Sequence, residues 1–465
     1  MAFKDSSGSN FNHMVGPSEK TKGWGWHALM VGNVWVSLPV LTLAGLWAGE
    51  IGTNDILIAG ILGSVIGGIF PWIGGYMGAK FSLPNTILSR GTWGTKGGVI
   101  SSLTTILSGL GWYATHLLLT ALVLIAIFTS ILHVSASYAI PIIIGAGLLS
   151  LGLGFTGINY ISKMAKYFVP VLLGLIIIMF VIAMQEVGWS YHNVAPIKST
   201  VSFGGVLNVS FSVFVMSFIF SGDYGRYLKD KKMSFGGAVG PILIQSFFIF
   251  VGVMMYVATG SADLVSQLIK MHLILVAGFI AVAVTVVTNV TNMYVPGLAL
   301  TTALGGYGKK VHRHIATVSM GVVGLILTLF VYTHISYFSF LDDFLTYIGV
   351  IFASANAVII TDFLLRRRNY RISDLESTSQ SNNYWYTKGY NVIAIVAFLL
   401  GAGIGIFMPQ RYIPLFDGLA ISSIIYLVGY AVSKKLKLSV KSDLDINAST
   451  VVTKDNEVIK DENEI

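Results

Sequence analysis

Long apolar runs, separated by short polar segments, recur along almost the whole chain. A hydrocarbon core about 30 Å thick is crossed by roughly 20 apolar residues in helical form. Measured against that length, the pattern predicts an all-α integral membrane protein with about twelve transmembrane helices. The predicted spans are 28–49, 54–79, 99–131, 138–158, 165–185, 203–227, 234–259, 265–303, 314–334, 341–365, 388–408 and 413–433.

Two of these spans contain residues that can interrupt a transmembrane helix. The first contains GNVWVSLP (32–39), with a glycine and a proline, and the sixth contains NVSFSVFVMSFIFSG (208–222), with four serines. A simple kink explains either segment by itself. Interrupted helices in corresponding halves of a transporter, however, line its central binding site. The separation of five spans therefore favours a pair of discontinuous helices, the first and the sixth, around a cavity.

The composition strengthens the prediction of a membrane protein. Hydrophobic residues make up 54% of the chain and charged residues only 11%, and the mean hydropathy is +0.75. A soluble domain carries about 25% charged residues. The 51 glycines suit transmembrane helices that approach one another closely. Because the chain has no cysteine, disulfides and thiolate metal sites are excluded.

The basic residues orient the predicted helices in the membrane. When the N-terminus is placed in the cytoplasm, only Lys198, Lys270 and Arg411 of the 29 lysines and arginines fall outside. This asymmetry follows the positive-inside rule and predicts a multi-pass protein of the plasma or inner membrane with both termini cytoplasmic. The net charge of +8 then indicates topology and contact with the lipid bilayer rather than nucleic-acid binding.

A tryptophan and a histidine lie one helical turn apart in the third span, within SGLGWYATHLLL (108–119). Residues four apart share a helix face, so Trp112 and His116 point in one direction. Packing inside the bundle explains this pair as well as a binding site does. No carboxylate lies near the middle of a predicted span. A cation site there must use carbonyl and hydroxyl oxygens, which suit Na⁺ or another hard cation.

The eighth span contains a polar cluster, TVVTNVTNMYVPG (285–297), where exposure to lipid would be expensive. Asn289 and Asn292 share a helix face at a spacing of three residues. Two amides can join neighbouring helices through hydrogen bonds, or they can bind a substrate that carries both donors and acceptors. Both interpretations remain open for Thr288, Asn289 and Asn292 at this point.

Catalytic chemistry finds little support in the chain. There is no HExxH-type metal spacing, no set of nucleophile, base and acid, and no phosphate-binding loop. We therefore expect no enzyme activity, no catalytic residue and no cofactor. A receptor is disfavoured because the chain has no sizeable soluble domain, and a channel because it has no repeated selectivity element.

The chain resembles the nucleobase–cation symporters of the purine–cytosine permease type, which include cytosine permeases and hydantoin transporters. Five segments carry this resemblance through their order and spacing. They are GYMGAKFSLPNTILSRGTWGTKGG (75–98), LGWYATH (110–116), SGDYGRY (221–227), TNVTNMYVPGL (288–298) and IITDFLLRRRNY (359–370).

The resemblance implies a leucine-transporter-type fold with a five-plus-five inverted repeat. The expected organisation has four parts. It consists of a cytoplasmic N-terminal segment (1–25), a ten-helix transport core (26–371), two additional C-terminal helices (372–437) and a disordered cytoplasmic tail (438–465).

The resemblance also implies where a flat heterocycle binds. It would lie between Trp112 on the third helix and Phe214 on the sixth, with His116, Asn289 and Asn292 reading its edge. Stacked aromatic faces suit a planar ring, and amides in the ring plane can bond its polar edge. The serines that flank the sixth-helix aromatic in cytosine permeases correspond here to Val213 and Met216. This difference leaves the identity of the heterocycle open.

The cation site implied by the resemblance joins the first and eighth helices. Its positions are Gly32 and Trp35 on the first, and Val284 and Thr288 on the eighth. Val287 stands where sodium-coupled relatives carry a hydroxyl residue, so the coupling ion is Na⁺ or a proton, the latter carried by His116.

Together these features predict a secondary transporter that imports a nucleobase or related heterocycle by cation symport with alternating access. A transporter of the same fold for an amino acid or vitamin precursor is the alternative. The sequence does not specify an oligomeric state.

Overall fold

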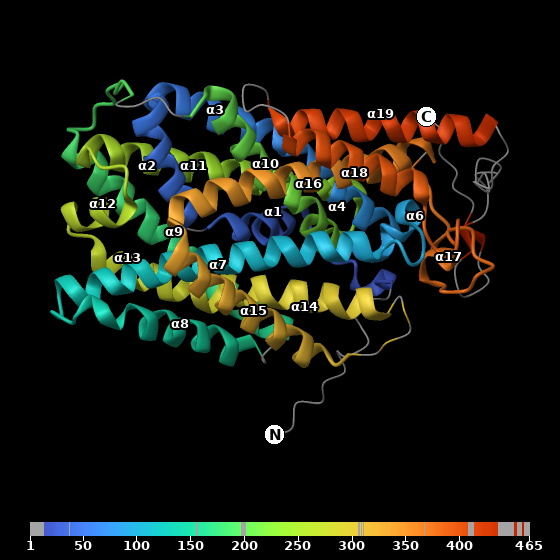
Figure 1. Ribbon diagram of the computed structural model, residues 1–465, viewed down its shortest axis with the longest axis horizontal. Helices are drawn as coiled ribbons and strands as arrows, with labels where there is room; N and C mark the ends of the chain where they lie inside the picture. The colour runs from blue at the N-terminus through green and yellow to red at the C-terminus, as the bar shows by residue number, and fades with distance from the viewer. Residues whose placement is uncertain are drawn as a thin grey trace.

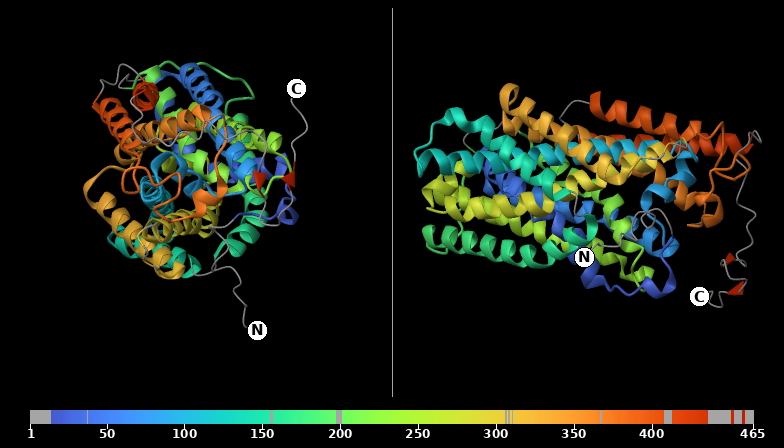
Figure 2. Two further views of the ribbon diagram at one scale, coloured as in Figure 1. Left: turned by 90° about the vertical axis from the view of Figure 1, so that its right-hand side faces the viewer. Right: turned by 90° about the horizontal axis from the view of Figure 1, so that it is seen from below.

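The computed structural model describes residues 14–36, 38–154, 157–196, 201–305, 307, 309, 311–366, 368–407, 413–435, 451–452 and 458–459. It is a bundle of helices that run mostly along the long axis of the molecule (Figures 1 and 2). The α-helices are α1 (Trp24–Gly32), α2 (Leu38–Ile51), α3 (Thr53–Gly67), α4 (Ile69–Phe81), α5 (Asn85–Leu88), α6 (Arg90–Trp93), α7 (Val99–Ser130), α8 (Ala139–Gly154), α9 (Gly157–Glu186), α10 (Phe203–Gly225), α11 (Gly236–Thr259), α12 (Leu264–Lys270), α13 (Ile274–Val284), α14 (Val290–Gly305), α15 (Arg313–His334), α16 (Tyr337–Leu365), α17 (Ile372–Glu376), α18 (Val392–Phe407) and α19 (Pro414–Lys435).

Short helical turns and two strands complete the described elements. The 3-10 turns are η1 (Pro17–Glu19), η2 (Asn33–Trp35), η3 (Ala136–Tyr138) and η4 (Lys231–Phe235), and η5 (Thr285–Asn289) is a π turn. The strands β1 (Val451–Val452) and β2 (Val458–Ile459) pair antiparallel. Apart from these strands, the tail predicted to be disordered (438–465) lies outside the described residues.

The prediction of an all-α membrane protein is confirmed. Ten helices in the described part of the chain are long and apolar enough to cross a membrane, and a bent pair raises this number to as many as eleven. The predicted span 388–408 corresponds to α18, whose 16 residues are shorter than a full crossing. Helices α18 and α19 pack on each other and on α16 at one side of the bundle (Figure 1).

The first predicted break is present. Helices α1 and α2 meet at an angle of 61°, with the turn η2 and a short non-helical link between them. Pro39 lies at the second position of α2, where its missing N–H costs no helical hydrogen bond. The α-helix therefore ends at the glycine of GNVWVSLP and begins again at Leu38, just before the proline.

The prediction of a discontinuous sixth helix is wrong for this structure. Helix α10 is continuous over its 23 residues. Its serines do not interrupt it, because Ser212 donates to the Asn208 carbonyl at 2.7 Å and Ser217 to the Val213 carbonyl at 3.4 Å. Such bonds to the carbonyl four residues earlier satisfy the hydroxyl inside the helix. The second irregularity is instead η5, in the middle of the eighth span.

Helix α10 packs unusually closely against α3 and α4 through glycines. A Cβ atom on Gly74 would lie 2.1 Å from the Phe218 carbonyl oxygen, and one on Gly78 would lie 2.0 Å from that of Gly222. Small residues of this kind allow transmembrane backbones to approach one another. The apolar stretch of α10 is 72% buried within the protein, a fraction matched only by α16 among the candidate spans in the described residues. Helix α10 is thus a central element of the bundle.

One end of the bundle gathers the basic segments, and we call it the basic end. There the Lys22 amide donates to the Tyr227 carbonyl at 3.0 Å, and the Lys80 ammonium donates to the Arg368 carbonyl at 2.5 Å. These bonds bring the N-terminal segment, the end of α10 and the residues that follow α16 to the same end.

A buried carboxylate joins several elements at the basic end. Asp362 on α16 pairs with Arg366 at 3.0 Å and accepts hydrogen bonds from Tyr426 at 2.6 Å, Thr92 at 3.0 Å and Tyr370 at 3.1 Å. Burial and the adjacent carboxylate raise the pKa of Tyr370 well above its usual range, so its hydroxyl remains a donor. The carboxylate thereby joins α6 and α19 to α16.

We expect Gly74→Ala to destabilise the protein, because the new methyl group would overlap the Phe218 carbonyl and force α4 away from α10. Overpacking of this kind costs about 1–3 kcal/mol, and thermal unfolding in detergent measures it. Gly145→Ala on α8 is the matched control, since no atom lies within 4 Å of that position. Equal unfolding temperatures for the two variants would show that α4 and α10 do not pack as described.

Candidate functional site

A pocket opens beside the break in the first span, between η2, α2, α7, α10 and α14. The space between these elements measures about 400 Å³, part of which is open to solvent. Most of its lining is aromatic or aliphatic, and three side chains supply polar groups. The lining residues are Val34, Trp35, Val40, Trp112, His116, Val213, Met216, Ser217, Phe220 and Asn292.

Helix α7 contributes the tryptophan and the histidine that the sequence places on one face. Their ring centroids lie 5.5 Å apart with an angle of 31° between the planes. Phe344 of α16 meets Trp112 edge-on, at 5.7 Å and 90°. Trp112 is half-buried and His116 is buried, and the Nδ1 atom of His116 has no hydrogen-bond partner among the described residues. Phe344 thus fixes one edge of the indole while the pair borders the pocket.

The broken first span contributes Trp35. Its indole N–H donates to the Oε1 atom of Gln245 at 2.6 Å, and the amide of Gln245 donates to the Ser210 carbonyl at 3.1 Å. Because the indole nitrogen is occupied by Gln245 on α11, only the ring remains for the pocket wall. Gln245 therefore joins the break in the first span to α10 and sets the direction of Trp35.

Phe214, the predicted sixth-helix platform, does not line the pocket. It is fully buried behind the wall, with its ring 5.2 Å from that of Trp35. The aromatic residue of α10 that lines the pocket is Phe220. The pocket face of α10 comprises Val213, Met216, Ser217 and Phe220, which follow a helical spacing of three, four and seven residues. This periodicity would have identified Phe220 if the sixth helix had been treated as continuous.

The two predicted asparagines of the eighth span occupy different environments. Asn292 lines the pocket, whereas Asn289 is fully buried at the end of η5 and is not part of the lining. Neither side-chain oxygen nor nitrogen of Asn289 has a partner in the described part of the chain, and the same holds for the Nδ2 atom of Asn292. A buried polar group without a partner costs about 1–3 kcal/mol. This cluster therefore carries unused hydrogen-bonding capacity beside the pocket.

The predicted cation positions lie on two separate parts of the bundle. Gly32 ends α1 and Trp35 ends η2, and α1 packs against α10 and α11. Val284 ends α13 and Thr288 lies within η5, which packs against α7, α8 and α9. No extended packing interface joins α1 to η5 among the described residues. The four positions thus lie on elements without a large shared interface, although Trp35 lines the same pocket as Asn292 of α14.

Most of the chain is similar to known permeases. Residues 14–429 match the family model described as a permease for cytosine/purines, uracil, thiamine, allantoin. The cytosine permease of Escherichia coli strain K12 is 25% identical over 416 residues, covering 87% of this chain and 90% of the relative. The purine-uracil permease NCS1 of Arabidopsis thaliana is 22% identical over 427 residues, covering 83% of this chain and 68% of the relative.

Solved structures show the same fold. The inward-facing conformation of Mhp1 superimposes with a TM-score of 0.78 at 17% identity, covering 91% of this chain and 94% of that one. Mhp1 in a closed conformation with bromovinylhydantoin bound gives a TM-score of 0.75, also at 17% identity, with 92% and 96% covered. The helical arrangement described above is therefore that of Mhp1, a nucleobase-cation-symport-1 family transporter.

We expect Asn289→Leu to leave the stability of the ligand-free protein unchanged or to raise it, because the substitution removes a buried amide that has no partner. Asn356→Leu is the matched control on α16, since the amide of Asn356 donates to the Val215 carbonyl at 2.6 Å. Breaking that bond should cost about 1–3 kcal/mol. Thermal unfolding of both variants in detergent provides the comparison, and an equal loss in both would mean that Asn289 is bonded within the protein.

Proposed function

This chain belongs to the family of permeases for cytosine and purines, uracil, thiamine and allantoin, and from that premise we propose a substrate and a coupling mechanism for it. It is a membrane transporter of the nucleobase type with alternating access, and not an enzyme. Our proposal is that it imports a planar nitrogen heterocycle through the pocket beside the broken first span, together with a cation.

The pocket supports this proposal through the arrangement of its aromatic and polar groups. Trp35, Trp112 and Phe220 supply aromatic surface, and His116, Asn292 and Ser217 supply donors and acceptors. A flat ring gains from stacking on aromatic faces, and a few polar side chains around its edge fix its orientation. The Nδ2 atom of Asn292, which has no partner among the described residues, would find one in such a ring.

The relatives carry ligands of this shape. Their names refer to cytosine, purines and uracil, and the bound Mhp1 holds bromovinylhydantoin. All of these molecules have flat rings with hydrogen-bond donors and acceptors at the edge. In this chain Val213 and Met216 form an apolar stretch of the wall on α10. We therefore propose that the ring's polar edge faces His116 and Asn292 on α7 and α14.

The coupling ion in our proposal is Na⁺ or a proton. For Na⁺, the ligands would be carbonyl oxygens of Gly32, Trp35 and Val284 and the hydroxyl of Thr288, all hard oxygen donors. For a proton, the carrier would be His116, the titratable side chain among the pocket-lining residues. The sodium ligands lie on spans that pack against different neighbours, and movement of these spans during the transport cycle would make and break the site.

We also propose that the basic end faces the cytoplasm of a plasma or inner membrane. The segments gathered there include the lysines before α1, the loop after α10 and the arginines after α16. Concentration of lysine and arginine at one membrane face is typical of the cytoplasmic side.

Uptake into proteoliposomes tests the function directly. We expect the purified protein to accumulate at least one heterocycle from a labelled panel of cytosine, uracil, purines, allantoin and hydantoins when a Na⁺ or proton gradient is imposed. Applying the two gradients in turn identifies the ion. Liposomes without protein and liposomes with collapsed gradients provide the baselines. The proposal fails if no compound accumulates under either gradient.

We expect Trp112→Ala to weaken binding of the accumulated heterocycle, because a stacking platform is lost. Stacking of a base on an aromatic side chain is worth about 1–3 kcal/mol, which corresponds to roughly 5- to 150-fold in affinity. Ligand-induced thermal stabilisation measures this change. Trp72→Ala is the matched control, since this tryptophan of α4 is 49% exposed and lies outside the pocket. Full stabilisation of the Trp112 variant by the substrate would exclude this residue from the site.

A further inference from the structure

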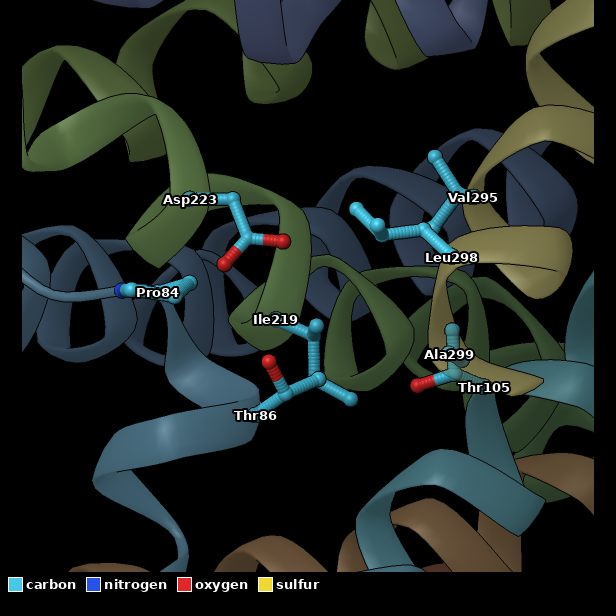
Figure 3. Close-up of a pocket in the computed structure, with 8 residues that line it drawn as sticks. All are labelled: Pro84, Thr86, Thr105, Ile219, Asp223, Val295, Leu298 and Ala299. Atoms are coloured by element: carbon cyan, nitrogen blue, oxygen red, sulfur yellow. The ribbon is translucent and has the colours of Figure 1, made fainter. Parts of the chain in front are cut away.

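A second pocket lies between the central pocket and the basic end. The space between α7, α10, α14 and the chain around the start of α5 measures about 290 Å³, part of which is open to solvent. Figure 3 shows the carboxylate of Asp223 and the hydroxyls of Thr86 and Thr105 directed into the same space. The remaining lining is apolar and consists of Pro84, Ile219, Val295, Leu298 and Ala299.

The two pockets follow one another along the same three helices. On α10, Phe220 borders the first pocket and Asp223, one turn later, borders the second. On α14, Asn292 and Val295 are related in the same way. Because the spacing of three residues advances about one helical turn, the second pocket lies next to the first in the direction of the basic end. A cation that leaves the central pocket toward that end passes Asp223.

The carboxylate of Asp223 is only partly engaged. Its Oδ1 atom accepts a hydrogen bond from the backbone N–H of Asn85 at 2.9 Å, and no other hydrogen bond or ion pair joins Asp223 to the described residues. The nearby guanidinium of Arg226 donates to the Tyr227 hydroxyl at 3.2 Å and lies over its ring at 5.0 Å. One carboxylate oxygen therefore faces the pocket without a partner from the protein.

The hydrogen bond to the first residue of α5 does not explain why position 223 carries a carboxylate. The bond to the Asn85 amide occupies one oxygen, and the amide oxygen of an asparagine would serve equally well as its acceptor. Asp223 is half-buried, and its second oxygen stays available although the positive charge of Arg226 acts on the carboxylate. The polar atoms lining the pocket are oxygens of a carboxylate and two hydroxyls, a set that suits a hard monovalent cation or a proton.

We propose that Asp223, with the hydroxyls of Thr86 and Thr105, forms a second cation site that the coupling ion occupies on its way out at the basic end. The proposal rests on cation-coupled transport as proposed above. The negative charge lowers the energy of the ion after it leaves the central site, and the neighbouring hydroxyls replace part of its water shell. Net transport therefore depends on Asp223, whereas binding of the heterocycle in the first pocket does not.

Asp223→Asn removes the negative charge but keeps the hydrogen bond to α5, because the amide oxygen can still accept from the backbone N–H of Asn85. We expect gradient-driven uptake of the accumulated heterocycle to fall by at least about tenfold, the scale of one lost charge-assisted contact. Heterocycle exchange under equal ion concentrations and ligand-induced thermal stabilisation should stay near the wild-type values. Thr105→Val should lower net uptake in the same direction by a smaller factor. Asp343→Asn, at an exposed position on α16, is the matched control.

Infrared difference spectroscopy tests the site without requiring transport. Adding Na⁺ should shift a carboxylate band, or lowering the pH should replace it by a carboxylic-acid band, in the wild-type protein and in Asp343→Asn but not in Asp223→Asn. The two treatments distinguish Na⁺ from a proton. If Asp223→Asn does not fold, an altered band in Thr105→Val provides the assignment.

The proposal is overturned if Asp223→Asn shows the same net uptake and the same ion dependence as the wild-type protein. It is also overturned if the infrared difference spectrum of this variant is the same as that of the wild type. Failure of the wild-type protein to accumulate any heterocycle would instead contradict the proposed function. The infrared result would still decide whether Asp223 binds a cation.

Discussion

The close contact between α4 and α10 is the constraint on which the rest of the structure depends. Two glycines of α4 let its backbone come so near to α10 that a methyl group on either would overlap a carbonyl oxygen. In a membrane the hydrophobic effect does not drive helices together, because the surrounding lipid is as apolar as their side chains. Close contact instead stabilises the pair through van der Waals packing and fixes the rotation of α10 about its own axis. Because the rotation of α10 is fixed, one face always presents Met216 and Phe220 to the central pocket and Asp223 to the second.

Some buried polar groups hold the fold together, and others, beside the two pockets, have hydrogen-bonding capacity that the described residues do not use. Asp362 has a partner on every side, and Gln245 uses both ends of its amide to join Trp35 and Ser210. Asn289 and one oxygen of Asp223 have no partner among the described residues, although a bonded group would be cheaper to bury. Buried polar atoms without a partner among the described residues therefore occur beside both pockets, and they occur elsewhere as well, as at Ser354 of α16 and Ser422 of α19.

The helices could be predicted from the sequence because the length of an apolar run follows directly from the thickness of the membrane. The break before Pro39 was also predictable, since proline removes a donor. The state of the sixth helix was not, because a serine hydroxyl can either line a break or return to its own helix, as Ser212 does. That error hid the pocket face of α10, and the choice of Phe214 rather than Phe220 came from the family resemblance. The π turn η5 inserts one residue per turn and changes the helix phase near Asn289, which no spacing rule anticipates.

The first and eighth spans pack against different helices, which suggests how ligand binding would move the bundle. Gln245 and the packing of α1 on α10 and α11 attach the break in the first span to one group of helices, while η5 belongs to another that includes α7 and α8. A ligand that touches Trp35 on one group and Trp112 with Asn292 on the other would draw the two groups together. The same approach would bring the carbonyls at the break toward the hydroxyl of Thr288. Binding of the heterocycle and assembly of the sodium ligands would then be one movement, and cation coupling would follow from the shared geometry.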